Sequence, residues 1–158
     1  MRKPSIPIKS GDYEVVTFYH PEMGYSTEFF TPPTRGGLHW QIRKLAQKLL
    51  VFEDYAERGY EKVCTLKVDQ ESYINLRLEN VVEEYKAQED TENLIKRQYH
   101  AGKCSMNTYI DTMRCTQDYK WTCIKRIDSL MRRLERHDYE CYSETAIVIY
   151  NHYLAAIL

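Results

Sequence analysis

Two long stretches in the second half of the chain carry apolar residues at every third or fourth position, and this spacing constrains the fold most strongly. The first contains Ile74, Leu78, Val81, Tyr85, Ile95 and Tyr99, and the second contains Ile110, Met113, Ile124, Ile127, Met131 and Leu134. Polar residues take some equivalent positions, namely Gln88, Glu92, Gln117 and Lys120. A break at residues 100–103 contains a glycine, and Ser105 after it is a typical N-cap. We therefore predict two helices of about thirty residues that form an antiparallel hairpin about 45 Å long.

The charges of the two stretches support this pairing. Residues 79–92 are rich in Glu and Asp, whereas residues 112–125 contain Arg114, Lys120 and Lys125. A hairpin that turns near residue 102 brings these two segments opposite each other. Each exposed ion pair contributes only a few tenths of a kcal/mol, but the pattern favours a single register of the two helices.

The first seventy residues have a different pattern. Residues 12–20 are rich in β-branched and aromatic side chains and predict a strand, residues 21–24 a turn, and residues 25–31 the returning strand. A Pro- and Gly-containing loop over residues 31–37 then leads into a helix that ends near Gly59, and one face of this helix carries Leu38, Ile42, Leu45, Leu49 and Phe52. Residues 60–68 predict a third strand, with Tyr60, Cys64, Leu66 and Val68 on one face.

The C-terminal segment, residues 143–158, favours a helix capped by Ser143, although the run Ile147-Val148-Ile149 is also typical of a buried strand. The predicted fold class is therefore α+β. A small ββαβ module over residues 1–70 precedes a long antiparallel helical hairpin and a C-terminal helix over residues 71–158. The hairpin either folds back into one compact unit or projects from it.

Composition excludes several classes of protein. The 158 residues are 43% hydrophobic and 28% charged, which excludes intrinsic disorder. Because 22 basic residues oppose 23 acidic ones, no overall field attracts the chain to nucleic acid or to an anionic membrane. Apolar runs are too short for a transmembrane helix or a secretory signal. Five irregularly spaced cysteines are typical of reduced thiols, so we expect a cytoplasmic protein.

The motif Arg35-Gly36-Gly37 precedes the first predicted helix, which contains His39. Glycines let backbone N–H groups approach a ligand, and a helix N-terminus favours anions. One hypothesis is therefore a small enzyme or binder of a phosphate-bearing ligand, with Arg35 as the counter-charge and His39 or His20 as the acid–base group. No P-loop or GxGxxG motif accompanies these residues, and a simple loop before a helix explains them equally well.

Metal and nucleophile motifs are weaker still. His137 and Cys141 lie four residues apart, but no CxxC pair accompanies them, so Cys115, Cys123 and Cys141 are interpreted as buried apolar side chains. The chain has no Gly-x-Ser-x-Gly elbow. We predict no metal site, no cofactor and no catalytic residue, and the sequence leans against an enzyme.

Basic residues with aromatic neighbours form two clusters. One lies near Trp40 and consists of Arg43, Lys44 and Lys48; the other lies near Trp121 and consists of Lys125, Arg126, Arg132, Arg133 and Arg136. Such clusters contact phosphates and stack bases, which gives a nucleic-acid-binding accessory protein as the first alternative function. The competing interpretation is that these charges neutralise the acidic helix.

The hypothesis we favour is a non-catalytic, regulatory protein that occupies a surface of a protein partner. The predicted helices exceed what a small sheet can bury, and the 14 tyrosines are good interface anchors. The simplest partner is a second copy, with two hairpins packed as a four-helix dimer. In composition, the short, Tyr-rich, motif-poor chain resembles phage-encoded proteins that act on a host, and this resemblance implies an inhibitor in the host cytoplasm.

Overall fold

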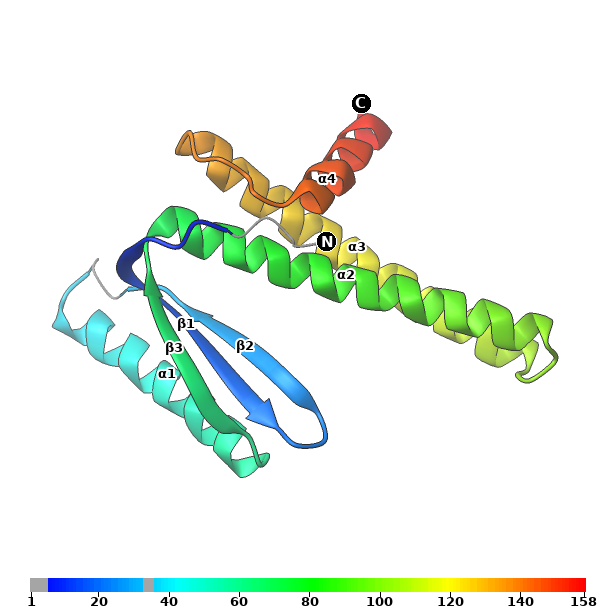
Figure 1. Ribbon diagram of the computed structural model, residues 1–158, viewed down its shortest axis with the longest axis horizontal. Helices are drawn as coiled ribbons and strands as arrows, with labels where there is room; N and C mark the ends of the chain where they lie inside the picture. The colour runs from blue at the N-terminus through cyan, green and yellow to red at the C-terminus, as the bar shows by residue number, and fades with distance from the viewer. Residues whose placement is uncertain (1–5, 33–35) are drawn as a thin grey trace. The chain divides into compact units, whose positions relative to one another are not determined.

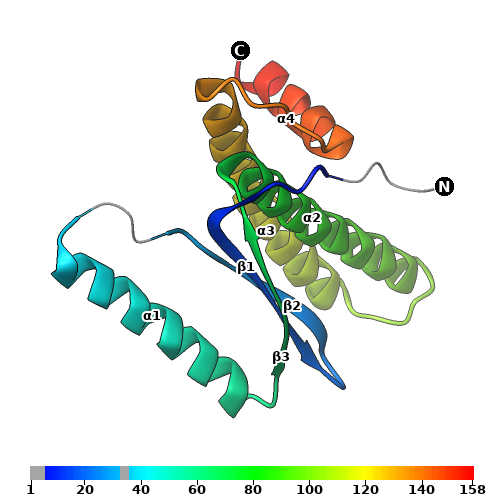
Figure 2. The ribbon, with the colours of Figure 1, turned by 60° about the vertical axis from the view of Figure 1, so that its left-hand side comes forward.

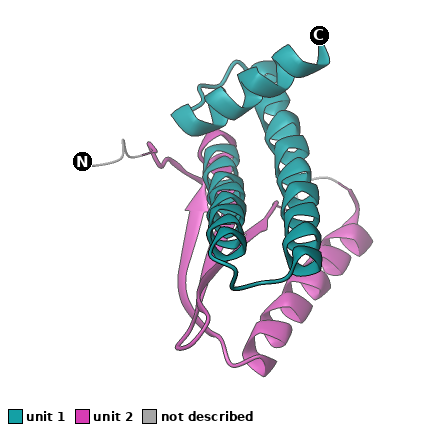
Figure 3. Ribbon diagram, turned by 90° about the vertical axis from the view of Figure 1, so that its right-hand side faces the viewer, with its two compact units in different colours: residues 1–4, 74–158 teal, residues 5–73 magenta. Residues whose placement is uncertain are grey.

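The computed structural model describes residues 6–32 and 36–158, and it confirms the α+β class: a three-stranded antiparallel sheet with one helix, then long helices (Figure 1). The chain divides into two compact units (Figure 3). Unit 2 runs to Tyr73 and contains the sheet and α1. Unit 1 runs from Ile74 to Leu158 and contains most of α2 together with α3 and α4.

The sheet has the order β2-β1-β3, with every neighbouring pair antiparallel. The strands are β1 (Ser10–His20), β2 (Gly24–Phe30) and β3 (Glu61–Val68), as the alternating apolar pattern predicts. Gly24 has φ +80° in the tight β1–β2 turn, a conformation that glycine adopts without strain. Val16 on the central strand lies opposite Glu28 of β2 and Thr65 of β3, so these three side chains share one face.

A β-bulge corrects one prediction about β3. The register changes from Thr17 opposite Cys64 to Phe18 opposite Lys62, so one extra residue interrupts the alternation of β3. Tyr60 consequently packs with the α1-facing cluster. Cys64 and Leu66 are exposed, and the predicted common face of these residues with Tyr60 is therefore wrong.

Helix α1 (Leu38–Glu57) lies on one side of the sheet (Figure 2). Gly59, with φ +89°, follows the helix end as predicted. The buried cluster here consists of Val16, Phe18 and Tyr55, with Val51 and Phe52 packed against it. The ring of Phe18 stacks on that of Tyr55 with the centroids 4.1 Å apart. The apolar face predicted from periodicity is thus mostly not the face that meets the sheet.

The opposite face of the sheet meets the first turn of α2 (Gln70–His100). Tyr73 packs against Tyr13 and Phe29, at centroid distances of 4.7 Å and 5.8 Å. Asp69 begins the helix, because its Oδ1 accepts a hydrogen bond from the Ser72 N–H at 2.9 Å.

The predicted helical hairpin is confirmed. Helices α2 and α3 (Met106–Arg136) lie side by side over most of their length (Figures 1 and 3). Gly102, with φ +72°, ends α2, and the Ser105 side chain caps α3 by accepting from the Thr108 N–H at 3.1 Å. Ion pairs join Glu84 to Arg126 and Glu92 to Lys120 across the hairpin. Of the three basic residues that the charge pattern sets against the acidic segment, Lys120 makes the expected pair, whereas Arg114 pairs with Asp111 on α3 itself.

The C-terminal segment is a helix, α4 (Glu144–Ile157), which packs on α3. Ser143 caps it by accepting a hydrogen bond from the Ala146 N–H at 3.2 Å. The buried Asn75 holds the preceding loop: its Nδ2 donates to the Glu140 carbonyl, and its Oδ1 accepts from the Tyr142 N–H, both at 2.9 Å. These bonds anchor α4 through a loop that the helical periodicity does not mark.

Candidate functional site

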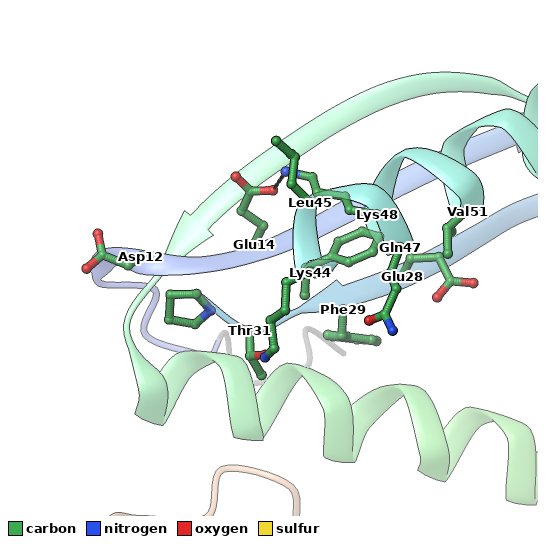
Figure 4. A pocket seen from close by; sticks show the side chains of 12 residues that line it. Asp12, Glu14, Glu28, Phe29, Thr31, Lys44, Leu45, Gln47, Lys48 and Val51 are labelled. Carbon is green, nitrogen blue, oxygen red and sulfur yellow. Dashed lines mark hydrogen bonds and ion pairs between the residues drawn. The ribbon is translucent and has the colours of Figure 1, made fainter. Parts of the chain in front are cut away.

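A cavity of unit 2 lies between α1 and the sheet, and its volume is about 550 Å³ (Figure 4). Three segments that are distant in sequence line it: residues 12–14 of β1, residues 28–32 at the end of β2, and residues 44–51 of α1. Its wall combines apolar side chains with three carboxylates, those of Asp12, Glu14 and Glu28, and two amines, those of Lys44 and Lys48.

The amines in this cavity are already engaged. Lys48 forms an ion pair with Glu14, drawn in Figure 4, and its Nζ also lies 5.7 Å from the ring centroids of Phe30 and Phe52. Lys44 donates a hydrogen bond to the Thr31 hydroxyl at 2.6 Å. These contacts hold α1 on the sheet and leave less positive charge for a bound anion.

A hydrogen-bonded chain runs beside the same cavity. The Tyr55 hydroxyl donates to Glu28 Oε1 at 2.6 Å and lies 2.8 Å from the Ser26 hydroxyl. Burial, followed by the hydrogen bond to Glu28, raises the pKa of Tyr55, so the phenol stays protonated at neutral pH. The arrangement positions a donor on a carboxylate, and the described residues that line the cavity include no histidine or cysteine.

The remaining polar candidates do not assemble into a metal centre. Among residues 6–32 and 36–158, no group of three or more His, Cys, Asp or Glu side chains is placed to hold a metal ion. Of the cysteines predicted to be buried, Cys123 is buried and Cys141 is half-buried. Cys115 is exposed, so that part of the prediction is wrong; Thr116, one position on, points into the hairpin instead.

The structure describes only part of the predicted anion site. Arg35 lies outside the described residues. Gly36 has φ +100°, and Gly37 is the N-cap of α1 without a side-chain hydrogen bond. His39 is exposed on the first turn, and His20 accepts hydrogen bonds at Nδ1 from the backbone N–H groups of its own turn. The phosphate-ligand hypothesis remains a prediction.

The two predicted nucleic-acid clusters lie in different units. In the α1 cluster, Lys44 and Lys48 make the contacts described above, while Arg43 is exposed. In the α3 cluster, Arg126 pairs with Glu84 at 3.3 Å and Arg132 with Asp128 at 3.0 Å, while Lys125 lies over Trp121. Arg136 is exposed, and Arg133 is half-buried. The ion pairs agree with neutralisation of acidic side chains, and nucleic-acid binding remains a prediction.

Unit 2 exposes apolar side chains along one side of α1. Leu38, Ile42, Leu45 and Leu49, which helical periodicity places on one face, are 72%, 58%, 55% and 56% exposed. Trp40 and Leu50 on the same helix are exposed as well. Isolated exposed apolar residues are ordinary, but a continuous stripe along a helix marks an interaction site.

Sequence reasoning did not identify the cavity residues Glu14 and Glu28. A signal for them exists, since Glu14 alternates with the buried Val16 and Phe18 along β1, which places all three on one face. The pattern does not show that Lys48 and Tyr55 lie beside these carboxylates, because only the packing of α1 on the sheet brings them there.

Comparison with known proteins gives no match: neither a protein-family model, nor a curated protein, nor a solved structure is significantly similar to this chain. Within the part of the chain that the structure describes, no helix is both long and apolar enough to cross a membrane.

Proposed function

We propose that this protein is a non-catalytic, regulatory binding protein that acts by covering a surface of a protein partner with the apolar side of α1. The observation that carries the proposal is the stripe of four exposed aliphatic side chains, Leu38, Ile42, Leu45 and Leu49. Burying aliphatic surface stabilises an interface by about 25 cal/mol per Å², so four such side chains supply a substantial part of a binding energy.

The cavity supports binding rather than catalysis. Its lysines are ion-paired or hydrogen-bonded within the unit, and Tyr55 beside it is held protonated by burial and by its hydrogen bond to Glu28. These contacts stiffen the support of α1, which lowers the conformational cost of binding through its outer side. An inhibitor of a host protein, as the composition suggests, is one form of this function.

Photocrosslinking in living cells tests the proposal. Benzoylphenylalanine at Ile42 should give a discrete crosslinked protein product, because this position lies in the centre of the stripe. The matched control is the same group at Asp54, which is exposed on another side of α1. Equal crosslinking at both positions would contradict the proposal. A product from Leu94 on the hairpin and none from Ile42 would move the binding surface to the helices of unit 1.

Nucleic-acid binding is the second candidate, and one contact favours it. The Lys125 ammonium lies 5.5 Å from the ring centroid of the exposed Trp121, an arrangement that suits stacking and phosphate contact together. If this function is correct, binding of a labelled oligonucleotide weakens steeply with salt, and charge reversal of Arg132 and Arg133 abolishes it. If that variant binds the oligonucleotide as wild type does, Arg132 and Arg133 serve the packing of the hairpin and do not contact nucleic acid.

A further inference from the structure

Helix α1 carries an apolar seam with the spacing of a two-stranded coiled coil. Its members are separated alternately by four and three residues: Leu38, Ile42, Leu45, Leu49, Phe52 and Ala56. Phe52 packs within unit 2, and the others are exposed. A repeat of 3.5 residues keeps a seam facing one partner helix along its whole length, so the shape of this surface fits another helix with the same repeat.

Most of the seam is accessible beside the sheet, although Phe52 also packs within unit 2 and Leu45 also lines the cavity. The side of α1 that meets the sheet is marked by Lys48, Val51 and Tyr55, which lie about 100° around the helix from the centre of the seam. A partner helix can therefore lie along the exposed part of the seam, with the half-buried Phe52 at its edge.

The charges beside the seam identify the partner. His39 and Arg43 lie in the N-terminal half of α1, and Glu53 and Glu57 lie in the C-terminal half, all of them exposed. Lys48 is held in an ion pair within its own unit. An antiparallel helix of the same sequence therefore sets the half that bears His39 and Arg43 against the half that bears Glu53 and Glu57 twice, whereas a parallel copy sets the two glutamates of one chain beside those of the other.

We propose that two copies of this chain pair through antiparallel α1 helices. This rests on the proposed function, because it names the partner of the same surface. With the two-fold axis near residue 47, Leu45 packs against the partner's Leu49, and Ile42 packs against the partner's Phe52. His39 then lies beside the partner's Glu53, and the small Ala46 close to the axis lets the helices approach.

Sedimentation velocity of the full chain over a range of concentrations tests the pairing. Wild type should be a dimer, and Leu49→Glu should weaken dimerisation by at least about 100-fold, since it removes a buried leucine twice per dimer. The matched control is Leu94→Glu, which changes an equally exposed side chain on α2 and should leave the dimer intact. A monomeric wild type overturns the proposal, as does a dimer that Leu94→Glu disrupts and Leu49→Glu does not.

A charge exchange tests the antiparallel arrangement without touching the apolar seam. His39→Glu places a carboxylate beside the partner's Glu53 and should weaken the dimer about three-fold, and His39→Glu with Glu53→Lys should restore it. Absence of restoration overturns the antiparallel register. Far-ultraviolet circular dichroism of each variant confirms that the fold is intact.

The two proposals fail in different ways. A photocrosslink from Ile42 to a different protein, together with a monomeric chain, overturns the self-pairing and leaves the binding function standing. A crosslink between two differently tagged copies supports both. Equal crosslinking at Ile42 and Asp54, together with a monomer, overturns both.

Discussion

The ion pair between Lys120 and Glu92 lies inside the hairpin, where it can be tested quantitatively. Lys120 Nζ is 3.5 Å from Glu92 Oε2 and 5.0 Å from the centroid of the Tyr85 ring. Glu92 is only 8% exposed, and its Oε1 is buried without a hydrogen-bond partner among the described residues. Lys120→Met keeps an unbranched side chain only one atom shorter and removes its charge, so the buried carboxylate loses its cation.

The expected cost is large for a single substitution. Breaking one half of a buried ion pair costs about 3–5 kcal/mol, because the remaining charge stays desolvated. Since one-fifth of the Lys120 side chain is exposed, we expect the lower end, about 3 kcal/mol. Replacing both partners, as Glu92→Leu with Lys120→Met, should bring stability to within about 1 kcal/mol of wild type or above it, because no buried charge remains.

Urea unfolding followed by circular dichroism at 222 nm measures these differences. The midpoint should fall in Lys120→Met and recover in the double variant, with the slope unchanged. The exposed pair Arg114–Asp111 is the matched control, and Arg114→Met should cost less than about 0.5 kcal/mol. The reasoning is refuted if Lys120→Met costs less than about 1 kcal/mol, or if the double variant is no more stable than the single one.

Three further predictions concern unit 2 and the end of α3. Gly11→Ala should destabilise by about 2 kcal/mol in thermal unfolding, because a Cβ there would lie 2.5 Å from the Val68 carbonyl oxygen; an unchanged melting temperature would show that the strand relaxes. Asp138 has φ +55°, so Asp138→Gly should stabilise by about 0.5 kcal/mol, and a loss of stability would contradict this. Because the pKa of Tyr55 is raised from 10.0, the contribution of its phenol to the free energy of unfolding is complete below pH 10. This contribution is lost as the pH rises through the pKa of Tyr55 in the folded protein. Tyr55→Phe should cost about 1 kcal/mol at pH 7 by removing the bond to Glu28, and the difference from wild type should shrink above pH 10.

The local part of the fold follows from the sequence because its determinants are local. The hairpin depends on spacing within each helix, on Gly102 and Ser105 at the turn, and on opposite charges that pair across the two helices. The ends of α1 and α4 follow from Gly59 and Ser143 in the same way, since a left-handed glycine or a capping hydroxyl acts within one turn of the helix. Neighbours in the sequence decide these features, so the sequence alone predicts them.

The candidate site was decided by tertiary packing. Periodicity shows that Leu38, Ile42, Leu45 and Leu49 share a face of α1, but it does not show what covers that face. In the folded unit, the side bearing Lys48 and Tyr55 meets the sheet instead, because carboxylates of β1 and β2 and the aromatic cluster hold it there. When a helix has apolar residues on more than one side and packs against a single sheet, one of those sides stays exposed. Contacts between residues distant in sequence decide which side is buried.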